Sequence, residues 1–142
     1  MNRNDQFLEY FRRYAIVALG AEPEKLAEFY DQSFLVAGPK GGAAFPNDAA
    51  FLAWLRQVHD FNVTTGMSSM AAEGVEQIRV SADYTLVAVR WAATFKKTGD
   101  APIRFTISYL LRESESGYKI AAYVSHEDQE VVMRSYGLLE NV

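Results

Sequence analysis

Hydrophobic residues recur at helical spacing in three segments of the first half of the chain. The first segment ends at Gly20 and carries one apolar stripe, formed by Phe7, Tyr10, Phe11, Tyr14, Val17 and Ala18. Pro23 suits the first turn of a second, shorter helix that we expect to end near Asp31. Asn47 is positioned to cap a third helix that we expect to finish around Asp60.

Four runs in the second half of the chain are extended and rich in β-branched and aromatic residues. They span Met67–Val80, Tyr84–Lys97, Ile103–Arg112 and Tyr118–His126. The segments between them are short and rich in turn-forming residues, so we expect neighbouring runs to pair antiparallel. After the last run, Ser125–Asp128 has the form of a capping box, which predicts a final helix over Glu127–Tyr136.

A short strand and a loop are expected between the second and third helices. Ser33–Gly38 is brief and apolar, which is typical of a strand. The next segment, Pro39–Pro46, holds two adjacent glycines between two prolines, and we interpret it as a flexible loop that forms a lip over a pocket. Gly74, inside the first long run, is expected to mark a bulge or a close backbone approach.

Both faces of the predicted strand over Tyr84–Lys97 are substantially apolar. One face carries Leu86, Ala88, Arg90, Ala92 and Thr94, and the other carries Thr85, Val87, Val89, Trp91, Ala93 and Phe95. In an antiparallel sheet with one solvent-exposed face, hydrophobic and polar residues would alternate more regularly along each strand. One face is expected to pack on the helices, so the apolar character of the other predicts a protein partner. The simplest partner is a second copy of the chain, and we expect a homodimer through the sheet.

Composition narrows the class of protein. The length of 142 residues fits a single domain over residues 1–142, and 49% hydrophobic against 23% charged residues is typical of a globular chain. A formal net charge of -4, with no Lys/Arg cluster longer than a pair, argues against a nucleic-acid partner. The absence of cysteine excludes disulfides, thiolate metal sites and cysteine nucleophiles. With no signal-peptide core and no apolar run of about 18 residues, we expect a cytoplasmic protein without a membrane partner.

The segment SYLLRESESGYKIAAYVSHED (Ser108–Asp128) has the strand, hairpin, strand and histidine ending that is common in one superfamily. Together with the order of predicted elements, it resembles the nuclear transport factor 2-like cone, which includes ketosteroid isomerase, scytalone dehydratase and SnoaL-type cyclases. The resemblance covers nearly the whole chain. It implies a cystatin-like α+β fold, with about three N-terminal helices on a curved antiparallel sheet and a short C-terminal helix. Such folds cup a pocket between sheet and helices and host enzymes, carriers and interaction modules.

A second stretch, RRYAIVALGAEPEKLAEFYDQSFLVAGP (residues 12–39), resembles the opening segment of ketosteroid isomerase. The resemblance places Tyr14 at the oxyanion-hole tyrosine, Gly38 at the position of the base, and Ile107 or Ser108 at the position of the acid. Isomerisation of that type requires a carboxylate base, a tyrosine and a protonated acid. Only Tyr14 supplies one of these groups, so isomerase activity of this type is not expected.

Two histidines are candidates for acid–base catalysis. His59 precedes Asp60 at the expected end of the third helix, where a histidine is also favoured by the helix dipole alone. His126 lies where the last strand meets the last helix, and the resemblance places a histidine near the pocket rim there; helix capping is the simpler role for its acidic neighbours. Because the chain has only two histidines and no close histidine spacing, we expect neither a metal site nor a cofactor.

Five further side chains are candidates for lining a ligand pocket. Arg90 is a charge within an apolar strand, so it could anchor a carboxylate ligand or pair with an acidic residue. Trp91, Tyr109 and Tyr123 could orient a ligand, although aromatic residues on sheets also serve as core or interface. Trp54 lies near the edge of the apolar side of the third helix.

Three classes of function follow from these features. The leading hypothesis is a homodimeric domain that binds a small molecule in a pocket between helices and sheet. The expected ligand is largely apolar, and the hypothesis includes ligands that bear a carboxylate. The enzyme alternative is a SnoaL-like or dehydratase-like lyase or isomerase, with His59 or His126 as acid–base and Tyr14 as hydrogen-bond donor. The third class is a non-catalytic module that associates with proteins through its sheet, and a filled cup would favour it.

Overall fold

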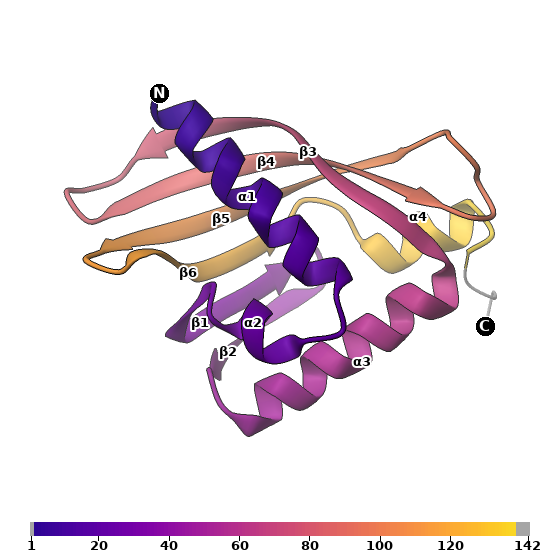
Figure 1. The fold of residues 1–142 in the computed structure, drawn as a ribbon, viewed down its shortest axis with the longest axis horizontal. Coiled ribbons are helices and arrows are strands. Elements are labelled where there is room, and N and C mark those ends of the chain that lie inside the picture. The colour runs from indigo at the N-terminus through magenta and orange to yellow at the C-terminus, as the bar shows by residue number, and fades with distance from the viewer. Residues whose placement is uncertain (1, 139–142) are drawn as a thin grey trace.

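One six-stranded sheet organises residues 2–138, the part of the chain that the computed structural model describes (Figure 1). The strands are β1 (Tyr30–Gly38), β2 (Gly41–Pro46), β3 (Met67–Arg79), β4 (Tyr84–Phe95), β5 (Ile103–Ser114) and β6 (Gly117–Ser125). Their order across the sheet is β2-β1-β6-β5-β4-β3. Neighbours pair antiparallel, as the turn signals predicted, except for β1 and β6, which are parallel.

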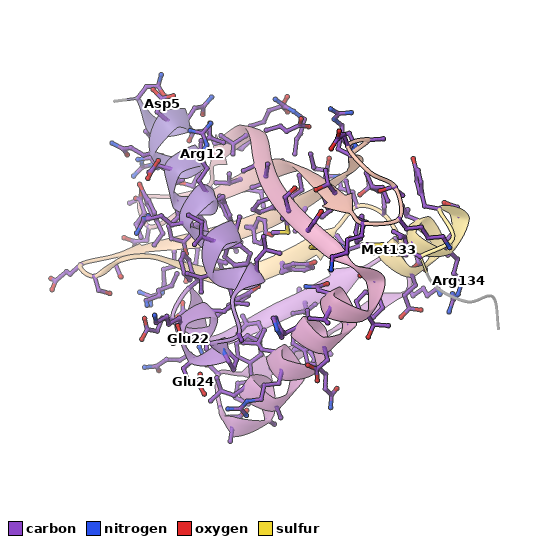
Figure 2. All side chains as sticks on the ribbon, turned by 45° about the vertical axis from the view of Figure 1, so that its right-hand side comes forward. Asp5, Arg12, Glu22, Glu24, Met133 and Arg134 are labelled. Carbon is purple, nitrogen blue, oxygen red and sulfur yellow. The ribbon has the colours of Figure 1, made fainter. Side chains whose placement is uncertain are left out.

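Helix α1 (Arg3–Leu19) lies across one face of the sheet (Figure 1). Asn2 caps it by accepting a hydrogen bond from the backbone N–H of Asp5 over 2.8 Å, and Gly20 ends it. The predicted apolar stripe faces the sheet, whereas Asp5 and Arg12 lie on the outward side (Figure 2). The helix is therefore held mainly by burial of its aromatic residues.

Helix α2 (Pro23–Ala27) has only five residues, so the prediction that it continues to Asp31 was wrong. Tyr30 already belongs to β1, where it pairs with Ile120 of β6. A strand rather than a helix forms here because β6 supplies a partner for the extended backbone, and the backbone N–H of Ile120 donates to the carbonyl of Phe29.

Helix α3 (Ala49–Thr65) is longer than predicted. Asp48, rather than Asn47, is its N-cap and accepts from the backbone N–H of Phe51. The expected end at Asp60 was wrong, because the helix continues to Gly66, whose φ of 77° provides a left-handed C-cap.

The segment predicted to be a flexible loop is the second strand of a hairpin. After β1, Pro39 and Lys40 form a two-residue turn, and Gly41 pairs with Gly38. Gly42 lies so close to Ala37 that a Cβ atom at this position would be 2.8 Å from the Cβ of Ala37. The glycines therefore permit tight strand pairing, and the flexible-loop prediction was wrong because pairing to β1 cannot be seen in local composition.

Helix α4 (Gln129–Ser135) follows β6. Its N-cap is Asp128, which accepts from the backbone N–H groups of Glu130 and Val131. The predicted capping box does not form, because the hydroxyl of Ser125 donates to the carbonyl of Glu127 instead. Met133 of α4 is buried and completes the core at this end (Figure 2).

The core lies between the helices and the side of the sheet that faces them, which we call the inner face. Its fully buried large side chains include Phe7, Phe11, Val87, Val89, Trp91, Phe95, Ile103, Tyr109, Leu111 and Ile120. The opposite side, the outer face, carries the alternate residues of each strand and is covered by no helix or strand of residues 2–138. No helix within residues 2–138 is both long enough and apolar enough to cross a membrane.

Candidate functional site

Three tyrosines and a tryptophan meet between α1 and the inner face. We call Tyr14, Tyr30, Tyr109 and Trp91 the tyrosine cluster. Tyr14 lies on the buried stripe of α1, Tyr30 opens β1, and the other two project from β5 and β4. The hydroxyl oxygens of Tyr14 and Tyr30 are 2.6 Å apart, and Trp91 Nε1 donates to the hydroxyl of Tyr109 over 3.2 Å. All four side chains are buried.

Burial is the largest influence on the acidity of these tyrosines. It raises the pKa of Tyr14, Tyr30 and Tyr109, so all three hydroxyls are protonated at neutral pH. Hydrogen bonds with Tyr30 and Tyr109 act to lower the pKa of Tyr14, whereas the bond with Tyr14 raises the pKa of each of those two. Either hydroxyl of the Tyr14–Tyr30 pair can be the donor in the bond between them.

The cluster has more hydroxyl hydrogens than internal acceptors can use. The hydroxyls of Tyr14 and Tyr30 carry two hydrogens but form one bond between them, and the hydroxyl of Tyr109 accepts from Trp91. Within residues 2–138, no carbonyl or carboxylate oxygen accepts from Tyr14, Tyr30 or Tyr109. At least one O–H of the Tyr14–Tyr30 pair is therefore left for another acceptor, and Tyr14 is the member of the pair whose ring lies beside Trp91 and Tyr109.

Tyr123 borders the tyrosine cluster and is less buried than its members. Its ring packs edge-on against Tyr109 at 5.5 Å, and its hydroxyl accepts from Gln129 Nε2 of α4 over 3.3 Å. Tyr123, Val36 and Met70 are only partly buried, whereas the α1 side is closed by fully buried phenylalanines.

The carboxylate next to Tyr30 in the chain is held by an arginine at the rim. Asp31 accepts two hydrogen bonds from Arg112, at 2.6 and 2.9 Å, beside a surface hollow of about 700 Å³. These bonds with Arg112 are the main reason that the pKa of Asp31 is lowered. A carboxylate kept ionised by a bidentate ion pair is a weak base, so Asp31 is poorly suited to proton abstraction.

His126 lies away from the tyrosine cluster. Its Nε2 atom is 2.7 Å from the hydroxyl of Ser108, which alternation places on the outer face because Ile107 and Tyr109 point inward. Glu127 accepts from the backbone N–H of Thr106 and so ties the same segment to β5. His126 therefore does not face the tyrosine cluster.

Arg90 also lies on the outer face. Its guanidinium crosses Gly74, where a Cβ atom would collide with Nη2, and it forms an ion pair with Glu76 at 3.6 Å. The register of β3 shifts between Ala72 and Gly74, so the prediction of a bulge or close approach at Gly74 is confirmed. Because it points away from the interior, Arg90 cannot anchor a ligand in the tyrosine cluster.

His59 and Trp54 lie on α3, outside the cluster. His59 is six residues before the end of the helix and lines a separate hollow of about 220 Å³ with Leu26 and Leu55. Trp54 is half exposed and stacks on Phe45 of β2. The structure thus brings Tyr14, Trp91, Tyr109 and Tyr123 together and leaves the two histidines, Arg90 and Trp54 elsewhere.

The positions compared with ketosteroid isomerase hold no acid or base. Gly38 ends β1, Ile107 is buried on the inner face without a polar group, and Ser108 lies on the outer face. Within residues 2–138, no group of three histidine or acidic side chains is arranged to hold a metal ion. The described residues of the interior can donate hydrogen bonds to a ligand, but they offer it no proton acceptor stronger than a hydroxyl.

Tyr30 and Gln129 are the members of the site that sequence reasoning missed. Tyr30 was assigned to the second helix, although its spacing from Phe34 and the run that follows it fit a longer strand. For Gln129 there was no signal, because its role depends on the position of α4 beside Tyr123.

Comparisons with known proteins place the fold. The model of the family NTF2-like protein (DUF6841) matches residues 3–128. An NTF2-like protein with a cystatin-like fold from Novosphingobium aromaticivorans is 17% identical, with a TM-score of 0.68 over 96% of this chain and 88% of that one. Among curated proteins, none matches the chain.

Two further solved structures are similar. An NTF-2 like protein of unknown function from Shewanella oneidensis is 11% identical, with a TM-score of 0.64 over 87% of this chain and 98% of that one. A ketosteroid isomerase-like protein from Erwinia carotovora is 23% identical, with a TM-score of 0.56 over 90% and 98%. At these identities the similarity concerns the fold alone.

Proposed function

The chain belongs to the NTF2-like protein family (DUF6841), and we propose that it binds a small, largely apolar molecule whose oxygen accepts a hydrogen bond from Tyr14. The observation that carries this proposal is the hydrogen bonding of the cluster, in which the Tyr14–Tyr30 pair has one more hydroxyl hydrogen than the bond between them uses. A buried donor without an acceptor costs about 1–3 kcal/mol, and a ligand oxygen would remove that cost.

The surroundings of the cluster favour a neutral ligand over a charged one. Aromatic rings enclose the three hydroxyls. The ring centroid of Tyr14 lies 6.1 Å from that of Trp91 and 5.9 Å from that of Tyr109. Arg90, the expected anchor for a carboxylate, lies on the other side of the sheet. A buried carboxylate without a cation is unfavourable, so we propose a ketone or a comparable acceptor on an apolar body.

The histidine-based lyase or isomerase gains no support from this arrangement. Neither His59 nor His126 hydrogen-bonds to a tyrosine of the cluster, and Asp31 is committed to Arg112. Hydrogen-bond donors alone can bind and polarise a carbonyl, but a proton must be removed to isomerise it. Binding is therefore the function that these side chains support.

Tryptophan fluorescence tests the proposal, with trans-2-decalone as probe and decalin, which lacks the oxygen, as its matched control. Trp54→Phe leaves Trp91, inside the cluster, as the only tryptophan of the chain. We expect the ketone to change Trp91 emission saturably and to raise the melting temperature. Tyr14→Phe should weaken ketone binding by about three- to tenfold, the effect of one hydrogen bond.

Two results would contradict the binding proposal. One is equal affinity for decalone and decalin, which would show that no hydrogen bond to the oxygen contributes. The other is a Tyr14→Phe variant that folds with unchanged stability and binds the ketone as tightly as the parent.

We infer further that two copies of the chain pair through the outer face. One row of paired residues crosses all six strands there, and we call it the outer row: Ala44, Leu35, Ala122, Leu110, Leu86 and Ile78. Ile78 is 67% exposed and Leu35 is 42% exposed. With strands about 4.8 Å apart, such a row is about 24 Å long, which suits a self-complementary contact.

Sedimentation equilibrium tests the pairing. The protein should sediment as a dimer of its 15.9 kDa chain at micromolar concentration, and Leu86→Lys should weaken the dimer at least tenfold. Ile16→Lys is the matched control, because Ile16 is an exposed apolar residue on α1 and lies outside the sheet. A monomeric parent protein, or a Leu86→Lys variant as dimeric as the control, would refute this inference.

A further inference from the structure

The two edges of the sheet are protected to different degrees. The edge strand β3 carries Glu73, Glu76 and Arg79 and has two register shifts, features that prevent another strand from pairing. The other edge strand, β2, has the sequence Gly-Gly-Ala-Ala-Phe-Pro and no charged residue, and all its residues are exposed. Within residues 2–138, no strand pairs with its free side.

The register of β1 and β2 determines which backbone groups face outward. The backbone N–H of Asn47 donates to the carbonyl of Gln32, and hydrogen-bonded pairs alternate along an antiparallel ladder. The N–H and C=O groups of Gly42 and Ala44 therefore point away from β1. Pro46 continues this outward set with a carbonyl but no N–H, which is where edge strands tolerate proline.

Contacts at both ends hold this edge in place. Near the turn, Lys40 forms an ion pair with Asp128 of the α4 cap at 3.0 Å. At the other end, the side-chain amide of Asn47 donates to the carbonyl of Ala27 in α2 over 2.8 Å and to those of Tyr30 and Asp31 at the start of β1. The edge is thus ordered before any partner arrives, which lowers the entropic cost of binding.

An exposed aromatic pair lies beside the outward backbone groups. The rings of Phe45 and Trp54 stack at 6.4 Å with an interplanar angle of 13°, and they are 40% and 45% exposed. Phe45 follows Ala44 directly, so a strand added to β2 would bring alternate side chains over this pair. On the outer face, Leu35 gives the same added strand a second apolar contact.

We propose that β2 recruits an extended segment of a different protein as a seventh strand, with an aromatic or large aliphatic side chain resting on Phe45 and Trp54. A second copy of this chain fits the edge less well. Two β2 strands side by side would oppose glycine and alanine to glycine and alanine and bury little apolar area, whereas stable protein interfaces bury about 1,200–2,000 Å². Small residues on β2 instead leave room for a partner's larger side chains.

A displayed library of random 12-residue peptides, selected on the full-length protein, tests the proposal. Enriched peptides should alternate large apolar residues around an aromatic one, and their affinities are then measured by fluorescence anisotropy. Ala44→Pro should weaken the binding of the enriched peptides at least tenfold, because it removes an outward N–H without removing a hydrogen bond to β1. Ala44→Ser keeps the N–H and should bind within twofold of the parent. Trp54→Ala should weaken binding severalfold.

A peptide-side change gives an independent readout that does not depend on folding of a variant. N-methylation of alternate residues of an enriched peptide should abolish binding in one register and leave the other register unaffected. The proposal is overturned if no peptide is enriched, if Ala44→Pro binds as the parent does, or if neither methylated register loses affinity. A parent dimer that Ala44→Pro dissociates and Leu86→Lys leaves intact would assign the edge to a second copy and also overturn it.

Discussion

Strands β4 and β5 present two different surfaces to their surroundings. On the inner face, Trp91 and Tyr109 are fully buried and joined by a hydrogen bond, and aromatic rings close over them. On the outer face, Leu86 and Leu110 pair in an apolar row that no element of residues 2–138 covers. The comparison teaches that apolar content alone does not locate a site. The inner face is distinguished by buried hydroxyl groups in an aromatic setting, whereas the hydroxyl of Ser108 on the outer face is exposed and bonded to His126.

Adjacent leucines of β5 provide the largest expected effect. Leu111 is fully buried on the inner face, and Leu110 lies on the outer face. Leu111→Ala should lower the free energy of unfolding by about 2–5 kcal/mol through lost burial and the cavity left behind. Leu110→Ala should cost about 1 kcal/mol or less at concentrations that keep the chain monomeric. Urea unfolding measures both, and equal losses would break the distinction between the faces.

The buried tyrosines should make the fold sensitive to alkali. Burial raises the pKa of Tyr14, Tyr30 and Tyr109 in the folded protein, whereas tyrosine in an unfolded chain has a pKa of about 10. The contribution of these tyrosines to the free energy of unfolding is therefore fully present below about pH 10. It falls as pH rises further, by about 1.4 kcal/mol per pH unit for each such tyrosine.

Unfolding in urea between pH 9 and 11, values chosen about the ordinary tyrosine pKa, measures this slope. Tyr14→Phe should make the fall of the unfolding free energy with pH less steep, by the contribution of one titrating tyrosine, about 1.4 kcal/mol per pH unit. An identical slope in the variant would show that Tyr14 loses its proton equally readily in the folded and unfolded chains, contrary to its burial.

The ion pair at the rim should give the smallest effect. The hydrogen bonds from Arg112 lower the pKa of Asp31 in the folded protein, so its contribution is present above the unfolded pKa of about 3.9 and is lost as pH falls further. Asp31→Asn should cost about 1 kcal/mol at pH 7 and progressively less below pH 4. The control is Glu73→Gln, which removes an exposed outer-face pair with Arg104 and should change stability less. A constant difference at all pH values would contradict this assignment.

Local sequence patterns predicted most of the fold, because most helices and strands can be recognised from the spacing of their own apolar residues and from the residues that end them. The stripe of α1, its stop at Gly20 and the runs of β3 to β6 could be read from spacing and turn residues. Strand β2 could not, because a glycine pair between prolines forms a strand only when β1 lies beside it. The parallel contact of β1 and β6 likewise joins segments far apart in the chain.

The site was predictable only in part. Tyr14, Trp91, Tyr109 and Tyr123 were recognised as candidate residues, but their convergence depends on how α1 crosses the sheet. Arg90 and His126 were equally plausible from residue type. Their exclusion required knowledge of which strand face packs on the helices, and a period of two does not reveal that when both faces are apolar.

The carbonyl stretching frequency of bound trans-2-decalone is the most direct test of the central claim that Tyr14 donates its surplus hydrogen to a ligand oxygen. Infrared difference spectra of the ketone with the parent protein should show a band at lower frequency than in an aprotic solvent, because a hydrogen bond weakens the C=O bond. With Tyr14→Phe the band should return toward the solvent value. The same frequency with the parent and the variant would contradict the account.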